Sequence, residues 1–105
     1  MNTPEAINET TTFRLSSRLR YRAVGDEGVL VHLENARVLV VNETGLHVVQ
    51  ALGRQAMTMT ELADSVAREF EVEPDQARAD VIAFLDQLRG EQALETGGAA
   101  ESTAG

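Results

Sequence analysis

The chain has 105 residues, which is enough for one small domain with a modest core. It contains no cysteine, and this excludes disulfides and thiolate metal sites. Its formal net charge of -8, concentrated between Glu61 and Glu95, disfavours binding to the phosphate backbone of nucleic acids. No stretch has the about 20 consecutive apolar residues of a membrane span, and no signal peptide is visible. A cytoplasmic protein with neither nucleic acid nor membrane as partner is expected.

The two ends of the chain are polar. Residues 1–17 are rich in Thr, Ser, Asn and Glu and are predicted to be largely flexible, with one short extended piece at residues 13–15. Residues 96–105 are small and polar, and they are predicted to be disordered because they bury too little surface to offset their ordering entropy. The folded domain is therefore predicted to span residues 18–95.

Three short runs of apolar and β-branched residues follow the polar start, and each predicts a strand. They cover residues 20–24, 28–33 and 37–41. Asn35 favours a turn between the second and third runs, which therefore form a hairpin. Together the runs predict a three-stranded antiparallel sheet.

Helical patterns begin directly after the third run. Asn42 is predicted to cap a first helix that ends at Gly53. Thr58 and Glu61 form a capping box before a second helix, and Pro74 suits the first position of a third. The core face of the third helix is predicted to consist of Ala77, Val81, Phe84, Leu85 and Leu88. The sequence thus predicts an α+β fold in which a three-stranded antiparallel sheet is followed by a three-helix bundle.

The sequence holds no recognisable catalytic arrangement. The serines lie outside any nucleophile-elbow context, and no glycine-rich phosphate loop is present. His32 and His47 lack partners at metal-ligand spacing and are interpreted as polar-face or half-buried side chains. The prediction is a protein that is not an enzyme and has no cofactor and no metal.

Two candidate surfaces for binding a partner remain. The run at residues 37–41 would leave an open apolar strand edge beside the helices. On the third helix an apolar spot flanked by arginines suits a segment with apolar and acidic side chains. Its members are Arg78, Ile82, Leu85 and Arg89. The alternative is an ordinary helix surface with one stray isoleucine.

The sequence from about residue 20 to 94 resembles the PqqD family, named for coenzyme PQQ synthesis protein D. Its members are RiPP recognition elements of ribosomally made, modified peptides. The resemblance is carried by the Asn-Glu-Thr-Gly junction at residues 42–45 and by the Asp-Val-x-x-Phe-Leu-x-x-Leu run at residues 80–88. It implies a winged-helix-like fold that binds the leader of a precursor peptide and presents it to a modifying enzyme, often a radical S-adenosylmethionine enzyme.

In that family the leader adds as a strand to the third strand, above the third helix. Carried over to this chain, the peptide-binding residues are Arg37, Val38, Leu39, Val40, Val41, Arg78, Ile82, Leu85 and Arg89. The open edge also permits a strand-swapped dimer, so that a monomer and a dimer both stay open. The alternative function is a winged-helix DNA-binding transcriptional regulator, which the acidic second and third helices disfavour.

Overall fold

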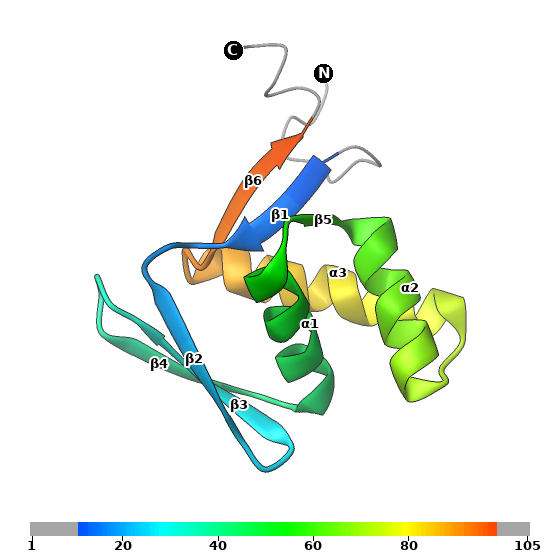
Figure 1. Cartoon of the computed structure of the whole chain (residues 1–105), viewed down its shortest axis with the longest axis horizontal. Coiled ribbons are helices and arrows are strands. Elements are labelled where there is room, and N and C mark those ends of the chain that lie inside the picture. The colour runs from blue at the N-terminus through cyan, green and yellow to red at the C-terminus, as the bar shows by residue number, and fades with distance from the viewer. Residues whose placement is uncertain (1–10, 99–105) are drawn as a thin grey trace.

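The computed structural model describes residues 11–98, and in this range the chain folds into three helices and two three-stranded antiparallel sheets (Figure 1). The elements are β1 (Thr11–Leu15), β2 (Leu19–Val24), β3 (Glu27–His32), β4 (Arg37–Val41), α1 (Glu43–Arg54), β5 (Met57–Thr58), α2 (Met59–Phe70), α3 (Pro74–Gly90) and β6 (Leu94–Gly98). Helix α1 contacts both β1 and β3, so it lies between the two sheets. The predicted α+β class is confirmed.

One sheet, ordered β5-β1-β6, contains segments from both predicted flexible ends. Phe13 in the central strand pairs with Met57 on one side and with Thr96 on the other. Its side chain is fully buried against the helices and fastens the strand to the core, against which Leu15 of the same strand also packs. The structure therefore differs from the predicted order of one sheet followed by a bundle. Strand β1 precedes the predicted sheet, β5 lies between α1 and α2, and β6 follows α3. The remaining end residues, 1–10 and 99–105, lie outside the described range.

The other sheet, ordered β2-β3-β4, is the predicted one. Its inner face alternates with the period of two that strands impose, and Leu30 and Val41 on that face are buried. Gly28 lies opposite Val41, and a Cβ there would come within 2.9 Å of Leu46 Cδ1, so the glycine permits close contact with α1. Within residues 11–98, β4 pairs only with β3.

The predicted helix starts are confirmed. The Asn42 side chain accepts a 2.9 Å hydrogen bond from the Gly45 N–H. Thr58 and Glu61 form the predicted capping box, and Pro74 begins α3. The predicted end of α1 is wrong, because the helix continues through Gly53 to Arg54.

Two adjoining clusters of buried apolar residues form the core. The first lies among the three helices and Phe13, and the second lies between α1, the end of α3 and the β2–β3–β4 sheet. Phe84 packs against both clusters and links them. In the described part of the chain, no helix is long and apolar enough to cross a bilayer.

Candidate functional site

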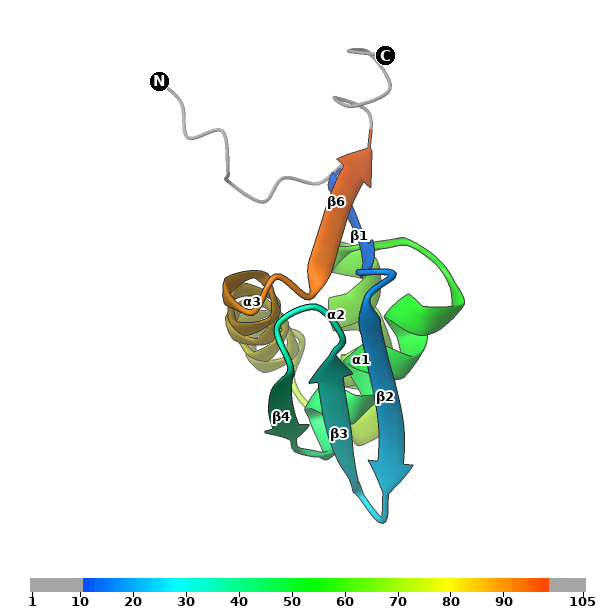
Figure 2. The same ribbon diagram turned by 90° about the vertical axis from the view of Figure 1, so that its left-hand side faces the viewer.

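In Figure 2, which views α3 nearly end-on, β4 is the strand of its sheet that lies nearest this helix, and Figure 1 shows that the two elements run in roughly opposite directions. At one end, Arg37 Nη2 at the start of β4 lies 3.0 Å from Glu91 Oε2, just after α3. At the other end, Gly45 beyond β4 packs against Phe84 in the middle of α3. Val38 and Val40 on this edge strand are 61% and 60% exposed. An apolar strand edge thus faces the flank of a helix.

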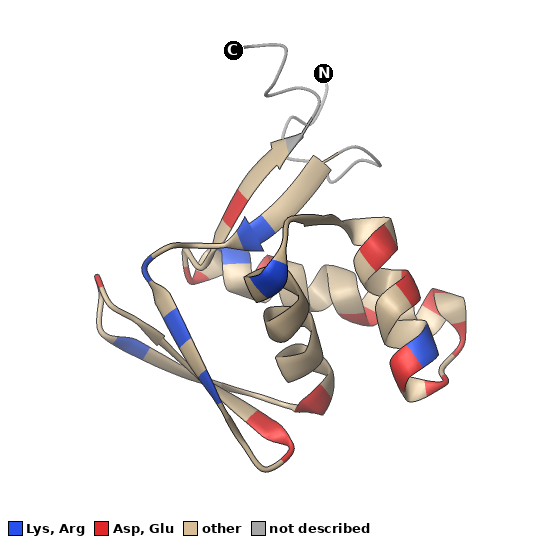
Figure 3. Cartoon of the chain, in the orientation of Figure 1, with Lys and Arg blue, Asp and Glu red and all other residues tan. Residues whose placement is uncertain are grey.

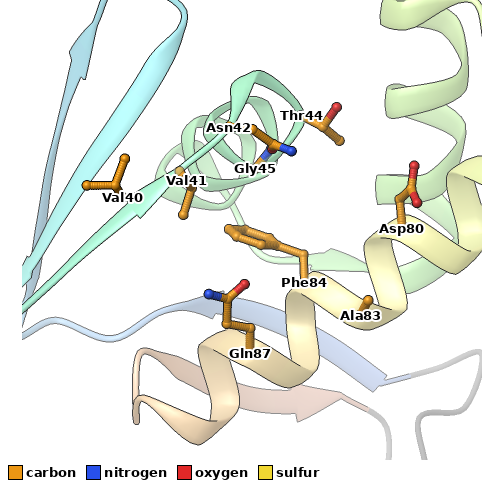
Figure 4. A pocket seen from close by; sticks show the side chains of 9 residues that line it. All are labelled: Val40, Val41, Asn42, Thr44, Gly45, Asp80, Ala83, Phe84 and Gln87. Atoms are coloured by element: carbon orange, nitrogen blue, oxygen red, sulfur yellow. The ribbon is translucent and has the colours of Figure 1, made fainter.

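A pocket of about 500 Å³ opens between the end of β4, the first turn of α1 and α3 (Figure 4). The residues that line it are Val40, Val41, Asn42, Thr44, Gly45, Asp80, Ala83, Phe84 and Gln87. The four from α3 follow one another at spacings of three, one and three residues, which places them on one face of the helix. The space between β4 and α3 that contains this pocket is called the groove below.

Gly45 makes room for the Phe84 ring. A Cβ at this position would lie 2.9 Å from Phe84 Cε1 and 3.0 Å from Val41 Cβ, closer than ordinary van der Waals contact. The junction at residues 42–45 therefore has two functions, since Asn42 caps α1 and the missing side chain of Gly45 lets the half-buried ring line the pocket. This packing gives a structural reason for a glycine inside the first turn of a helix, where it is otherwise unfavourable.

The pocket carries a negative charge at one end. Asp80 is the one ionisable side chain among the nine residues that line it. Its Oδ1 accepts a 2.8 Å hydrogen bond from Gln76 Nε2, a neutral donor. Arg37, the one basic residue of β4, is paired with Glu91 at the opposite end of the groove. Over residues 11–98, acidic residues gather on α2 and the α2–α3 connection, whereas basic residues are scattered over strands and helices (Figure 3).

The structure separates the predicted site residues. Val40 and Val41 line the pocket, and the rest of β4 continues the same open edge. Leu85 is fully buried in the core among the helices, so it cannot contact a peptide on the surface of α3. This part of the predicted site is corrected, because Leu85, the third member of the apolar–arginine pattern, also belongs to the core stripe.

The remaining predicted residues of α3 do not line the pocket. Arg78, Ile82 and Arg89 each lie two positions from a residue that does, and two positions correspond to about 200° of helical rotation. They therefore occupy the other flank of the core stripe. The flank that faces β4 carries Asp80, Ala83, Phe84 and Gln87, none of which the sequence analysis placed in the site. Helical spacing shows that a helix has two flanks beside its core face, but not which flank meets the neighbouring strand.

Both histidines have structural partners. His32 is 4% exposed; its Nδ1 accepts a hydrogen bond from the Glu34 N–H at 3.2 Å, and its Nε2 lies 3.0 Å from the Gln92 carbonyl oxygen. His47 Nε2 lies 2.7 Å from Ser65 Oγ. Among residues 11–98, no three His, Asp or Glu side chains come together as a group that could hold a metal ion.

The chain is similar in fold to TbiB1 in complex with the TbiA(beta) leader peptide, at 23% identity and a TM-score of 0.70, over 78% of this chain and 94% of that one. It is also similar to a lasso peptide synthetase B1 complexed with the leader peptide, at 23% identity and a TM-score of 0.67, over 79% of this chain and 96% of that one.

A third similar structure is the PqqD truncation of Methylobacterium extorquens PqqCD, described as a functional and stand-alone RiPP recognition element. It is 20% identical with a TM-score of 0.70, over 88% of this chain and 97% of that one. No curated protein sequence matches significantly. The model of the family described as coenzyme PQQ synthesis protein D (PqqD) matches residues 27–94, well over half of the chain. The chain therefore belongs to the PqqD family.

Proposed function

We propose that this protein is a non-catalytic RiPP recognition element that binds the leader region of a ribosomal precursor peptide and presents it to a modifying enzyme. The observation that carries the proposal is the open apolar edge of β4, which faces α3 across a groove. A peptide added as a strand to β4 pairs its backbone with free groups of that edge. Its side chains alternate in direction, so every second one enters the pocket.

The similar structures support this proposal. TbiB1 and the lasso peptide synthetase B1 are each complexed with a leader peptide, and the Methylobacterium extorquens domain is a RiPP recognition element. At 20–23% identity these proteins share the fold with this chain. The transfer of peptide binding to this chain is our inference, and it rests on the groove described above.

The proposed contacts are the backbone of β4 and the flank of α3 that carries Ala83 and Phe84. The role in peptide binding that the sequence predicted for Arg78, Ile82 and Arg89 is the competing hypothesis, in which the peptide uses the other flank of α3. The modifying enzyme is proposed to be a radical S-adenosylmethionine enzyme that meets the complex in the cytoplasm. The chain is proposed to act as a monomer, because a strand-swapped dimer would occupy the same edge of β4 as the peptide.

The alternative, a winged-helix DNA-binding regulator, has no support from these relatives. Its recognition helix would need several basic or amide side chains. The groove face of α3 offers one amide, Gln87, beside the carboxylate of Asp80.

The test is isothermal titration calorimetry of the full chain with the leader of the precursor encoded beside its gene, with the core segment of that precursor as the control ligand. Two adjacent exposed positions of α3 give a matched pair of variants. Ala83→Lys places a charged chain in the pocket and is expected to weaken leader binding about tenfold, whereas Ile82→Lys is expected to leave it unchanged within about twofold. Failure of the leader to bind would contradict the proposal. Loss of binding in the Ile82 variant alone would move the site to the flank with Arg78 and Arg89.

A further inference from the structure

We infer that the groove selects a peptide segment with one basic side chain, placed against Asp80 two residues from an apolar side chain that packs on Phe84. This inference rests on the proposed function and adds the chemical class of its ligand. The observation behind it is that the groove carries a negative charge at Asp80, whereas the surface predicted from the sequence is flanked by the positive charges of Arg78 and Arg89.

The two ends of the groove differ electrostatically. At the Arg37 end, an ion pair of 3.0 Å brings opposite charges together. At the other end, Asp80 is exposed and accepts its hydrogen bond from the neutral amide of Gln76, so this carboxylate has no ion-pair partner among the described residues. A cationic side chain of a bound peptide would supply that partner, and an acidic one would be repelled.

The spacing follows from the dimensions of the two elements. Asp80 lies one helical turn before Phe84, and one turn rises about 5.4 Å. Residues on the same face of a strand are two positions, or about 6.7 Å, apart. An apolar side chain of the peptide on Phe84 thus places the side chain two residues away beside Asp80, within reach of the flexible stem of Lys or Arg.

The protein as a whole favours the same ligand. The net charge of -8 attracts cationic peptides from a distance, but this attraction carries no information on position. The local contribution of Asp80 can be separated from that of the net charge, because α3 also carries the exposed carboxylate of Asp86, which does not line the pocket. Removing either charge changes the net charge equally, and only one of the two removals changes the groove.

The experiment uses a yeast-displayed library of random 14-residue peptides, selected on the full chain and on the Asp80→Asn, Asp80→Arg and Asp86→Asn variants. Peptides enriched on the unaltered chain are expected to carry Lys or Arg two residues from an apolar residue. Synthesised peptides of this kind are expected to bind Asp80→Asn about two- to fivefold more weakly, as for an exposed ion pair, and Asp86→Asn unchanged. Selection on Asp80→Arg is expected to exchange the basic residue for Asp or Glu.

Other outcomes overturn either the inference alone or the inference together with the proposed function. Enrichment of neutral or acidic peptides on the unaltered chain overturns the inference and leaves the proposed function intact. The same result follows if Asp80→Asn and Asp86→Asn weaken binding equally, because the preference then reflects only net charge. If no peptide is enriched on any variant and the cognate leader also fails to bind, both the inference and the proposed function are contradicted.

Discussion

Both sheets have three strands, but the strand that matters most in each has a different place: β1 is central in one sheet, and β4 is at the edge of the other. In the β5-β1-β6 sheet the central strand is β1, whose Phe13 is fully buried, and both of its edges are paired. In the β2-β3-β4 sheet, β4 presents one unpaired edge with exposed Val38 and Val40. The first sheet thus fastens a strand to the core through Phe13, and the second is the sheet for which we propose peptide binding.

The edges of the β2-β3-β4 sheet also differ from each other. The β2 edge carries Arg20 and Arg22, and charged side chains on an edge discourage pairing with another strand. The β4 edge has valines at the corresponding register positions, Val38 and Val40, and lies beside α3. An edge that is both apolar and next to a helical wall is suited to a specific peptide strand.

The largest expected effect comes from the β5-β1-β6 sheet. Phe13→Ala removes the fully buried ring of β1 and is expected to lower the free energy of unfolding by about 3–5 kcal/mol. Urea denaturation followed by circular dichroism measures this change. The affinity of the molecules that remain folded for the leader should be unaltered. A loss below about 1 kcal/mol would show that β1 is not fastened to the core by this residue.

The second largest effect is expected from a substitution at Gly45, where the second sheet joins helix α1. Gly45→Val forces a side chain into the space beside Phe84 and Val41, and should cost about 1–3 kcal/mol of stability and weaken leader binding. Gly90→Val is the matched control, because a Cβ there meets no atom within 4 Å. Thermal unfolding of the two variants compares them, and equal midpoints would contradict the steric account.

The two edges of one sheet are compared by Val40→Lys and Val24→Lys. Both valines are exposed, at 60% and 54%, so each variant should change stability by less than about 0.5 kcal/mol. Only Val40 lines the pocket, so leader affinity should fall about tenfold in the Val40 variant alone. Fluorescence anisotropy with a labelled leader measures this difference. Equal losses of leader affinity in the two variants would contradict the proposal that the peptide binds at the β4 edge and not at the β2 edge.

The smallest expected effect is at the ion pair that joins β4 to the end of α3. Glu91→Gln should lower the free energy of unfolding by about 0.5 kcal/mol or less, since Arg37 is 61% exposed and solvent screens the pair. Leader affinity should stay within about twofold of the original value. A tenfold change would mean that the pair positions the edge of β4 for binding.

The sequence predicted the regions where local signals are strong. The bounds of β4 and the caps at Asn42 and Thr58 were predicted because apolar runs and capping residues act within a few positions. The β1–β6 pairing joins residues about 80 positions apart, such as Phe13 with Thr96, and no local pattern indicates it. The role of Gly45 beside Phe84 was missed for the same reason, since the contact depends on how two helices and a strand meet.

The measurement that tests the central claim most directly is an amide NMR titration of the ¹⁵N-labelled full chain with its unlabelled cognate leader. The account predicts large shifts and slowed hydrogen exchange at residues 37–41 and shifts at the groove flank of α3, with cross-strand contacts between β4 and the leader. Residues of β2 and of the β1–β6 pair should stay unchanged. Saturable binding that shifts β2 or β6 and leaves β4 unaffected would contradict it.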